Sequence, residues 1–139
     1  MTDEQGSIIE YEDDISNAEA PEPLPEGDYP AVVRSAERKV SGAGNPYVAV
    51  GFYISPDDYP PDFPVEEEPD GVLLTYRRVP GGTTKRDRYR MRMFCESIGA
   101  PTGSRMNLND WIGLNASVTV VQEDYEGEPR AQIVKVSAE

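Results

Sequence analysis

The residues best suited to binding chemistry are the basic side chains of the segment GGTTKRDRYRMRMF, at positions 81–94. Between Lys85 and Arg92 this segment has five basic residues and one acidic residue, although the whole chain has a formal net charge of −13. Guanidinium and ammonium groups bind phosphates and carboxylates. A concentration of cations within so acidic a protein indicates a local anion-binding surface.

Several classes of catalytic site are excluded, because the sequence contains no histidine. Ser-His-Asp sites, Cys-His sites and zinc sites all need histidine in their standard forms. The phosphate-binding pattern GxxxxGK[ST] is also missing, and the acids at 57–58 and 66–70 lie in a proline-rich loop that is a poor scaffold for a metal. We therefore expect no enzyme, no catalytic residue, no metal site and no cofactor. The one cysteine, Cys95, cannot form an internal disulfide, which fits a reducing compartment.

The acidic residues are concentrated in two segments. Residues 1–27 contain nine Asp and Glu residues and residues 55–70 contain seven, and neither segment contains Lys or Arg. Together they exceed the net charge of −13, so the rest of the chain is net positive. Residues 1–26 are expected to form an acidic, largely disordered tail, since they are rich in acids and proline and mostly lack apolar periodicity. Residues 27–139 are expected to form one domain, interrupted by an acidic, proline-rich loop at 55–70.

The domain has the pattern of a mainly β protein. Strands are predicted at residues 28–40, 46–54, 71–79, 116–125 and 130–138, with Gly-rich or Pro-rich turns between them. The clearest is PYVAVGFYI, in which one face alternates strictly with the other. Its core face consists of Val48, Val50, Phe52 and Ile54, and its outer face consists of Tyr47, Ala49, Gly51 and Tyr53.

One helix is predicted at residues 85–98. Thr84 is a suitable N-cap, and Gly99 followed by Pro101 ends the helix. Its buried stripe follows the i, i+3, i+4, i+7 spacing and consists of Met91, Phe94, Cys95 and Ile98. Its basic residues fall on the two flanks of that stripe, with Lys85, Arg88 and Arg92 on one flank and Arg86 and Arg90 on the other.

Three strands, a helix and a closing hairpin are typical of a five-stranded Greek-key barrel with a helix between strands three and four, the OB-fold arrangement. An open α+β sandwich built from the same elements is the alternative. Trp111, in the loop before the fourth strand, is expected to be a plug in the interior of the barrel, and Tyr125, beside the final hairpin turn, is within reach of a ligand.

The stretch LPEGDYPAVVRSAERKVSGAGNPYVAVGFYI resembles the opening of phage-encoded single-stranded-DNA-binding proteins, with a P-x-G-x-Y sequence leading into a first strand, a Gly-rich turn and a second strand. RMFCESIGAP is similar to the helix of those proteins, and WIGLNASVTVVQEDYEGEPRAQIVKV to their closing hairpin. The resemblance covers roughly residues 24–136. It implies an OB fold and non-specific binding of single-stranded DNA during phage replication or recombination, in the cytoplasm of the bacterial host.

A protein that binds single strands needs cations along the backbone and flat groups beneath the bases. The second and third strands of an OB barrel form the usual binding face. The aromatic candidates there are Tyr47, Tyr53 and Tyr76. The candidates for phosphate contacts are Arg34, Arg38, Lys39, Arg77, Arg78, Lys85, Arg86, Arg88 and Arg90.

The position of the acidic tail differs from that in many of the proteins that this chain resembles. Many of those proteins have an acidic tail at the C-terminus, whereas this chain has its acidic tail at the N-terminus and ends in KVSAE. The tail is expected to recruit phage replication or recombination proteins, or to act with the 55–70 loop as a screen that weakens DNA binding. No apolar run approaches the ~20 residues that span a bilayer, and no signal peptide is apparent, so no membrane partner is expected. Two other functions compete: an acidic mimic that inhibits a nucleic-acid-binding protein, and a phage structural or decoration protein.

Overall fold

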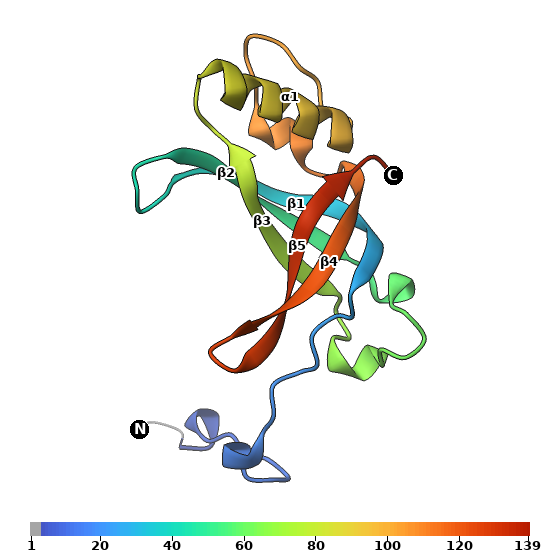
Figure 1. The fold of residues 1–139 in the computed structure, drawn as a ribbon. Coiled ribbons are helices and arrows are strands. Elements are labelled where there is room, and N and C mark those ends of the chain that lie inside the picture. Colours follow the sequence, from blue (N-terminus) through green and yellow to red (C-terminus); the bar gives the residue numbers. More distant parts are fainter. Residues whose placement is uncertain (1–3) are drawn as a thin grey trace.

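The computed structural model describes residues 4–139 (Figure 1); residues 1–3 of the predicted tail lie outside the described residues. The regular elements of this range are strands β1 (Gly27–Val40), β2 (Pro46–Ile54), β3 (Val72–Pro80), β4 (Asn115–Tyr125) and β5 (Glu128–Ser137), and helix α1 (Lys85–Ile98). Short 3₁₀ turns occur at Glu4–Ser7, Ile15–Asn17, Pro56–Asp58, Val65–Glu67 and Leu108–Trp111. The prediction of a mainly β domain with one helix between the third and fourth strands is confirmed.

The five strands form one antiparallel sheet in the order β3-β2-β1-β4-β5. The sheet is strongly curved, and its two edge strands, β3 and β5, contact each other (Figure 1). Helix α1 packs against β3, β4 and β5 and so covers one end of the curved sheet. The predicted bounds of β2 and α1 match the structure, and those of the other strands differ by one or two residues at their ends.

The ends of α1 are set by local side chains and backbone. The Thr84 hydroxyl accepts a hydrogen bond from the backbone N–H of Asp87 at 3.1 Å. Gly99 adopts the left-handed conformation, with φ at 73°, and its N–H donates to the carbonyl of Cys95. Three residues of the predicted stripe are buried (Phe94, Cys95 and Ile98), and the fourth, Met91, packs half-buried against the same cluster.

The core lies inside the curve of the sheet and beneath α1. The four apolar residues assigned to the inner face of β2 are all buried there. Trp111 is fully buried, with its ring 5.4 Å from that of Phe94, which confirms that it lies in the interior. Its indole N–H has no hydrogen-bond partner among the described residues. No helix within residues 4–139 combines the length and apolar character that a membrane crossing requires.

The packed domain begins before residue 27, which corrects the predicted end of the tail. Leu24 is only 2% exposed and belongs to the core. The Gln122 side-chain amide donates to the carbonyls of Leu24 and Pro23, at 3.1 and 3.3 Å. A single apolar residue between prolines has no periodicity, so its burial cannot be seen in the sequence pattern. The side chains of residues 6–22 are all exposed, and this part extends away from the sheet (Figure 1).

The acidic loop at 55–70 is folded against the domain. Phe63 is 3% exposed, and its ring meets that of Tyr59 edge to face, with 4.9 Å between centroids. The Tyr59 hydroxyl donates to the carbonyl of Glu68 at 2.7 Å, which joins the two halves of the loop. The loop's carboxylates are therefore carried on a folded segment.

Candidate nucleic-acid interface

A groove of about 400 Å³ runs between the edge strands β3 and β5. Its polar lining includes Arg77 and Arg78 of β3, Arg130 of β5 and Tyr125 at the end of β4. No acidic side chain of residues 4–139 contributes to its lining. We call this feature the seam groove, because it lies where the two edges of the sheet meet. Its guanidinium groups create a positive surface on an acidic protein.

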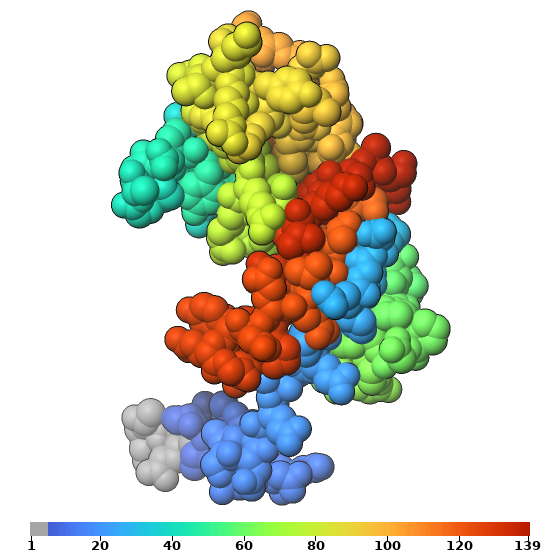
Figure 2. Space-filling model, viewed as in Figure 1, coloured from blue at the N-terminus to red at the C-terminus, as the bar shows by residue number. Residues whose placement is uncertain are grey.

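The seam groove lies on the indented side of the molecule. The β1–β2 and β4–β5 hairpins project on the same side, with β3 between them (Figure 1). Figure 2 shows the surface hollowed between the β4–β5 hairpin and β3, and the two hairpins rising on either side.

A β-bulge turns both arginines of β3 outward. In the register of β2 and β3, Ala49 alone lies opposite Arg77 and Arg78. The flanking residues Tyr76 and Val79 therefore both face the core, although three positions separate them. Strict alternation would have sent one arginine inward. Both arginines are exposed instead, which doubles the charge that β3 presents to the groove.

The basic lining continues from the seam groove to α1. Arg78 also lines an adjoining hollow of about 350 Å³ between β3 and the helix. Arg90 and Met93 of α1 line the same hollow. The two adjoining hollows are thus lined by four arginines: Arg77, Arg78, Arg130 and Arg90. Arg90 lies on the flank of α1 that was predicted for it.

Tyr76 does not share a stacking platform with Tyr47 and Tyr53. Its ring stacks on that of Phe94, with 5.9 Å between centroids and 12° between the ring planes. Burial raises the pKa of the Tyr76 phenol, and the nearby Arg78 opposes that rise. Position 76 alternates in phase with the inward residues of β3, so the predicted aromatic candidate Tyr76 lies apart from Tyr47 and Tyr53 and lines the hollow beside α1 with Arg78 and Arg90.

The predicted pair Tyr47 and Tyr53 does occupy the outer face of β2. However, the guanidinium of Arg34 lies 4.0 Å from the centroid of the Tyr53 ring. Gly71 packs against the same ring, so closely that any side chain there would clash with it. The Tyr53 ring is therefore covered, and the surface offers the guanidinium plane of Arg34, on which bases also stack.

A second arginine–tyrosine pair consists of Arg130 and Tyr125, of which only the tyrosine was predicted from the sequence. The Arg130 guanidinium lies 4.4 Å from the centroid of the Tyr125 ring. Tyr125 was noted for its place beside the hairpin turn, whereas Arg130 was not among the predicted cations. The signal was available in the turn at Glu126 and Gly127, because a tight hairpin folds the start of β5 back beside the end of β4.

The remaining predicted cations do not join the seam groove. Arg38 and Arg88 line a separate hollow on the other side of α1, together with Arg92. Lys39 forms an exposed ion pair with Glu37 at 3.7 Å, which is worth little in free energy. Lys85 and Arg86 are exposed in the first turn of α1 and line neither hollow. The predicted division of the helix cations onto two flanks is therefore confirmed for Arg88, Arg90 and Arg92, and it separates them into two sites.

Acidic side chains gather at the far end of the seam groove. Glu22, Glu68 and Glu128 line a hollow that shares Arg130 and Leu73 with the groove. The backbone N–H of Glu22 donates to the carboxylate of Glu67 at 2.9 Å, so the tail and the acidic loop meet there. The negative segments thus adjoin the positive groove without lining it.

Cys95 is fully buried, and burial raises the pKa of its thiol, with Glu96 adding to the rise, as expected of a core thiol. Within residues 4–139, no group of three or more His, Cys, Asp or Glu side chains is arranged to hold a metal ion. The sequence matches no protein-family model, and no curated protein matches it at a significant level.

Proposed function

We propose that this protein binds single-stranded DNA without sequence preference, and that it protects strands during phage replication or recombination in the cytoplasm of the bacterial host. The observation that carries the proposal is the seam groove, with arginines from two edge strands and a tyrosine but no carboxylate in its described lining. The resemblance of residues 24–136 to phage-encoded single-stranded-DNA-binding proteins supports the same function. The protein acts by binding and not as an enzyme.

We also infer that the sheet is a Greek-key barrel of the OB type. The order β3-β2-β1-β4-β5, the contact between β3 and β5, and the helix between β3 and β4 support that arrangement. In such a barrel a ligand crosses the second and third strands between the two hairpin loops. The seam groove and the outer face of β2 meet this expectation, because both adjoin β3.

The chemistry of the interface suits unpaired nucleotides. Arg77, Arg78 and Arg130 can neutralise successive phosphates, and Arg90 extends the row toward α1. The bases can stack on Tyr125 and on the guanidinium plane of Arg34, each stacked base contributing about 1–3 kcal/mol. Stacking reads no base edge, so binding tolerates any sequence. Duplex DNA hides its base faces, so it forfeits the stacking contribution.

Fluorescence anisotropy with a labelled strand of about 30 nucleotides tests the proposal against a duplex of equal length. Single strands should bind more tightly, with log K falling by about 0.7 per neutralised phosphate for each unit of log salt. The double variant R77Q/R130Q should weaken binding at least tenfold, about 1.4 kcal/mol, and flatten the salt slope. Its matched control is R105Q, since Arg105 is exposed and lines none of these hollows. Equal losses in both variants, or equal affinity for the duplex, would refute the proposal.

A second candidate function concerns partners and not DNA. The tail carries Ile8, Ile9, Tyr11 and Ile15, all exposed, interspersed with carboxylates. Such a segment suits docking to a basic, apolar surface of another protein, either to recruit a phage replication or recombination protein or to mimic a nucleic acid. A mimic should bind a basic partner and ignore oligonucleotides, so the same anisotropy titration separates the two. Nothing among the described residues favours a structural or decoration protein.

A further inference from the structure

The hollow on the other side of α1 gathers arginines from two separate elements. It has a volume of about 710 Å³ and is bordered by β1, the β3–α1 connection, α1 and the loop at 102–106. Arg38 reaches it from β1, and Arg88 and Arg92 reach it from consecutive turns of α1. We call it the arginine hollow. It shares no lining residue with the seam groove or with the hollow beside Arg90.

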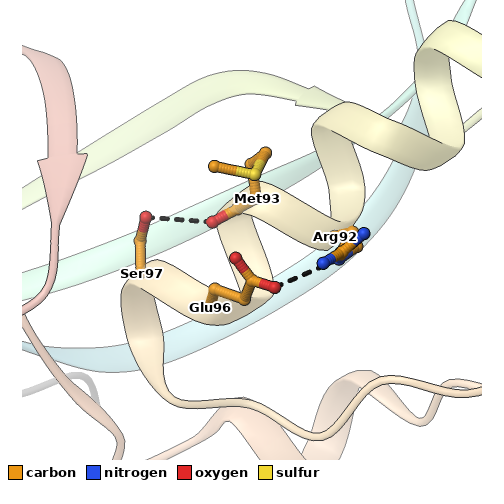
Figure 3. A network of polar contacts seen from close by, with 4 residues as sticks. All are labelled: Arg92, Met93, Glu96 and Ser97. Atoms are coloured by element: carbon orange, nitrogen blue, oxygen red, sulfur yellow. Dashed lines mark hydrogen bonds and ion pairs between the residues drawn. The ribbon is translucent and has the colours of Figure 1, made fainter.

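The positive charge of the arginine hollow is only partly balanced. Arg92 pairs with Glu96 at 3.1 Å along the exposed side of α1, away from Met93 (Figure 3). Arg38 and Arg88 form no ion pair with any residue in 4–139. No Asp or Glu side chain of residues 4–139 lines the hollow, and the carboxylate of Asp87 lies against Gly82 at its border. Of the three guanidinium groups that line the hollow, only that of Arg92 has a carboxylate partner, and an anion between them would relieve their mutual repulsion.

The rest of the lining suits a ligand that has polar and apolar groups in addition to its negative charge. Thr83, Thr102 and Ser104 bring hydroxyl groups that can donate to phosphate oxygens. Met91 and Met106 are half-buried and form an adaptable apolar wall, to which a flat ring can pack. A bare inorganic ion would leave the wall and most of the volume unused.

We infer that the arginine hollow binds a nucleoside monophosphate unit, with its phosphate among Arg38, Arg88 and Arg92 and its base against the two methionines. A phosphomonoester carries nearly two negative charges near neutral pH, against one for each phosphate within a strand, so the clustered arginines favour it. The unit comes either as a free nucleotide or as the phosphorylated end of a strand. This site goes beyond the proposed function, because strand binding uses the separate seam groove.

The direct test is a titration of the full chain with thymidine 5′-monophosphate, followed by ¹H–¹⁵N NMR, including the arginine side-chain Nε–H signals. Saturable shifts are expected for Arg38, Arg88 and the backbone at 81–83 and 102–106. Thymidine, which lacks the phosphate, should bind at least about tenfold more weakly, and inorganic phosphate, which lacks the base, should also bind more weakly. Shifts confined to the seam groove, or equal binding of thymidine, would overturn the inference.

Matched variants separate a built site from general charge attraction. R38Q/R88Q should weaken binding of the monophosphate at least tenfold, since each charged hydrogen bond lost is a large fraction of the affinity of a small ligand. R105Q removes a cation from the same loop without touching the hollow and should leave affinity within about twofold. Circular dichroism checks that both variants are folded. Equal effects of R38Q/R88Q and R105Q would overturn the inference.

A last pair of titrations identifies the source of the monophosphate. Oligonucleotides that differ only in a 5′-phosphate or 5′-hydroxyl are compared on the native protein and on R38Q/R88Q. Tighter binding of the phosphorylated strand, lost in R38Q/R88Q, assigns the site to strand ends, whereas equal binding of both assigns it to free nucleotides. Monophosphate binding without any oligonucleotide binding would refute the proposed function and leave this site standing. Oligonucleotide binding through the seam groove without any monophosphate binding would refute this site and leave the proposed function standing.

Discussion

The acidic tail at residues 4–22 and the acidic loop at residues 55–70 are both rich in Asp, Glu and Pro, yet only the loop packs against the sheet. In the loop Phe63 is buried and Tyr59 closes onto Glu68. In the tail the large apolar side chains stay exposed, with Ile9 at 74%. The tail therefore has apolar groups of its own but no surface to bury them against.

The difference comes from how each segment is attached. The loop is held at one end by β2 and at the other by β3, so folding the sheet already meets most of the entropic cost of ordering it. The tail is fixed only near Leu24, and ordering it would cost about 1–2 kcal/mol per residue with little burial in return. Composition alone does not separate an anionic segment that folds from one that does not.

The largest effect expected from this comparison is the loss of the loop's buried ring. Phe63→Ala should lower the free energy of unfolding by about 3–5 kcal/mol, because it removes apolar contacts and leaves a cavity. The matched tail variant, Ile9→Ala, should change it by less than about 0.5 kcal/mol. Urea unfolding followed by circular dichroism measures both. Similar losses in the two variants would mean that the tail is packed in solution.

Deleting residues 2–19 tests whether the charge of the tail affects DNA binding. The deletion stops before Leu24, so the free energy of unfolding should not change. Affinity for a single strand at low salt should rise by about tenfold, because seven carboxylates are removed from a tail whose attachment at Glu22 adjoins the positive groove. The gain should shrink as salt screens the tail. Anisotropy titrations at several salt concentrations measure it, and unchanged affinity at low salt would show that the tail is no screen.

The loop offers a smaller and pH-dependent effect through Tyr59. Burial raises the pKa of this phenol above 10.0, and Glu68 adds to the rise. The neutral phenol is thus favoured in the folded state, so its contribution to stability is complete below about pH 10 and is lost as pH rises through the raised pKa. Tyr59→Phe should cost about 1 kcal/mol at neutral pH, for the hydrogen bond to Glu68.

The same variant should lose less stability than the native protein between about pH 9 and about pH 11, since it lacks this ionisation. Tyr11→Phe, in the exposed tail, is the control and should behave as the native protein does throughout. Urea unfolding across that range is the measurement. An identical alkaline loss in Tyr59→Phe and the native protein would contradict the assignment.

Much of the fold could be predicted because its signals are local. The caps at Thr84 and Gly99 delimit α1, and the alternation in 46–54 predicts β2 and its buried face. The candidate site was harder. Arg77 and Arg78 were predicted as binding residues, but the bulge that exposes both depends on the register with β2. Arg130 was overlooked because its importance comes from facing β3 across the seam, about fifty residues away in the chain.

By itself, the sequence determined the elements, the excess of positive charge on α1 and the concentration of acid in two segments, since these follow from side chains a few positions apart. Only the tertiary structure decided which cations act together. It divided the helix arginines between two hollows, placed Arg34 on Tyr53 and turned Tyr76 onto Phe94. The physical reason is that a binding surface is made by strand register and by the contact of distant edges, and neither is encoded in any short stretch of residues.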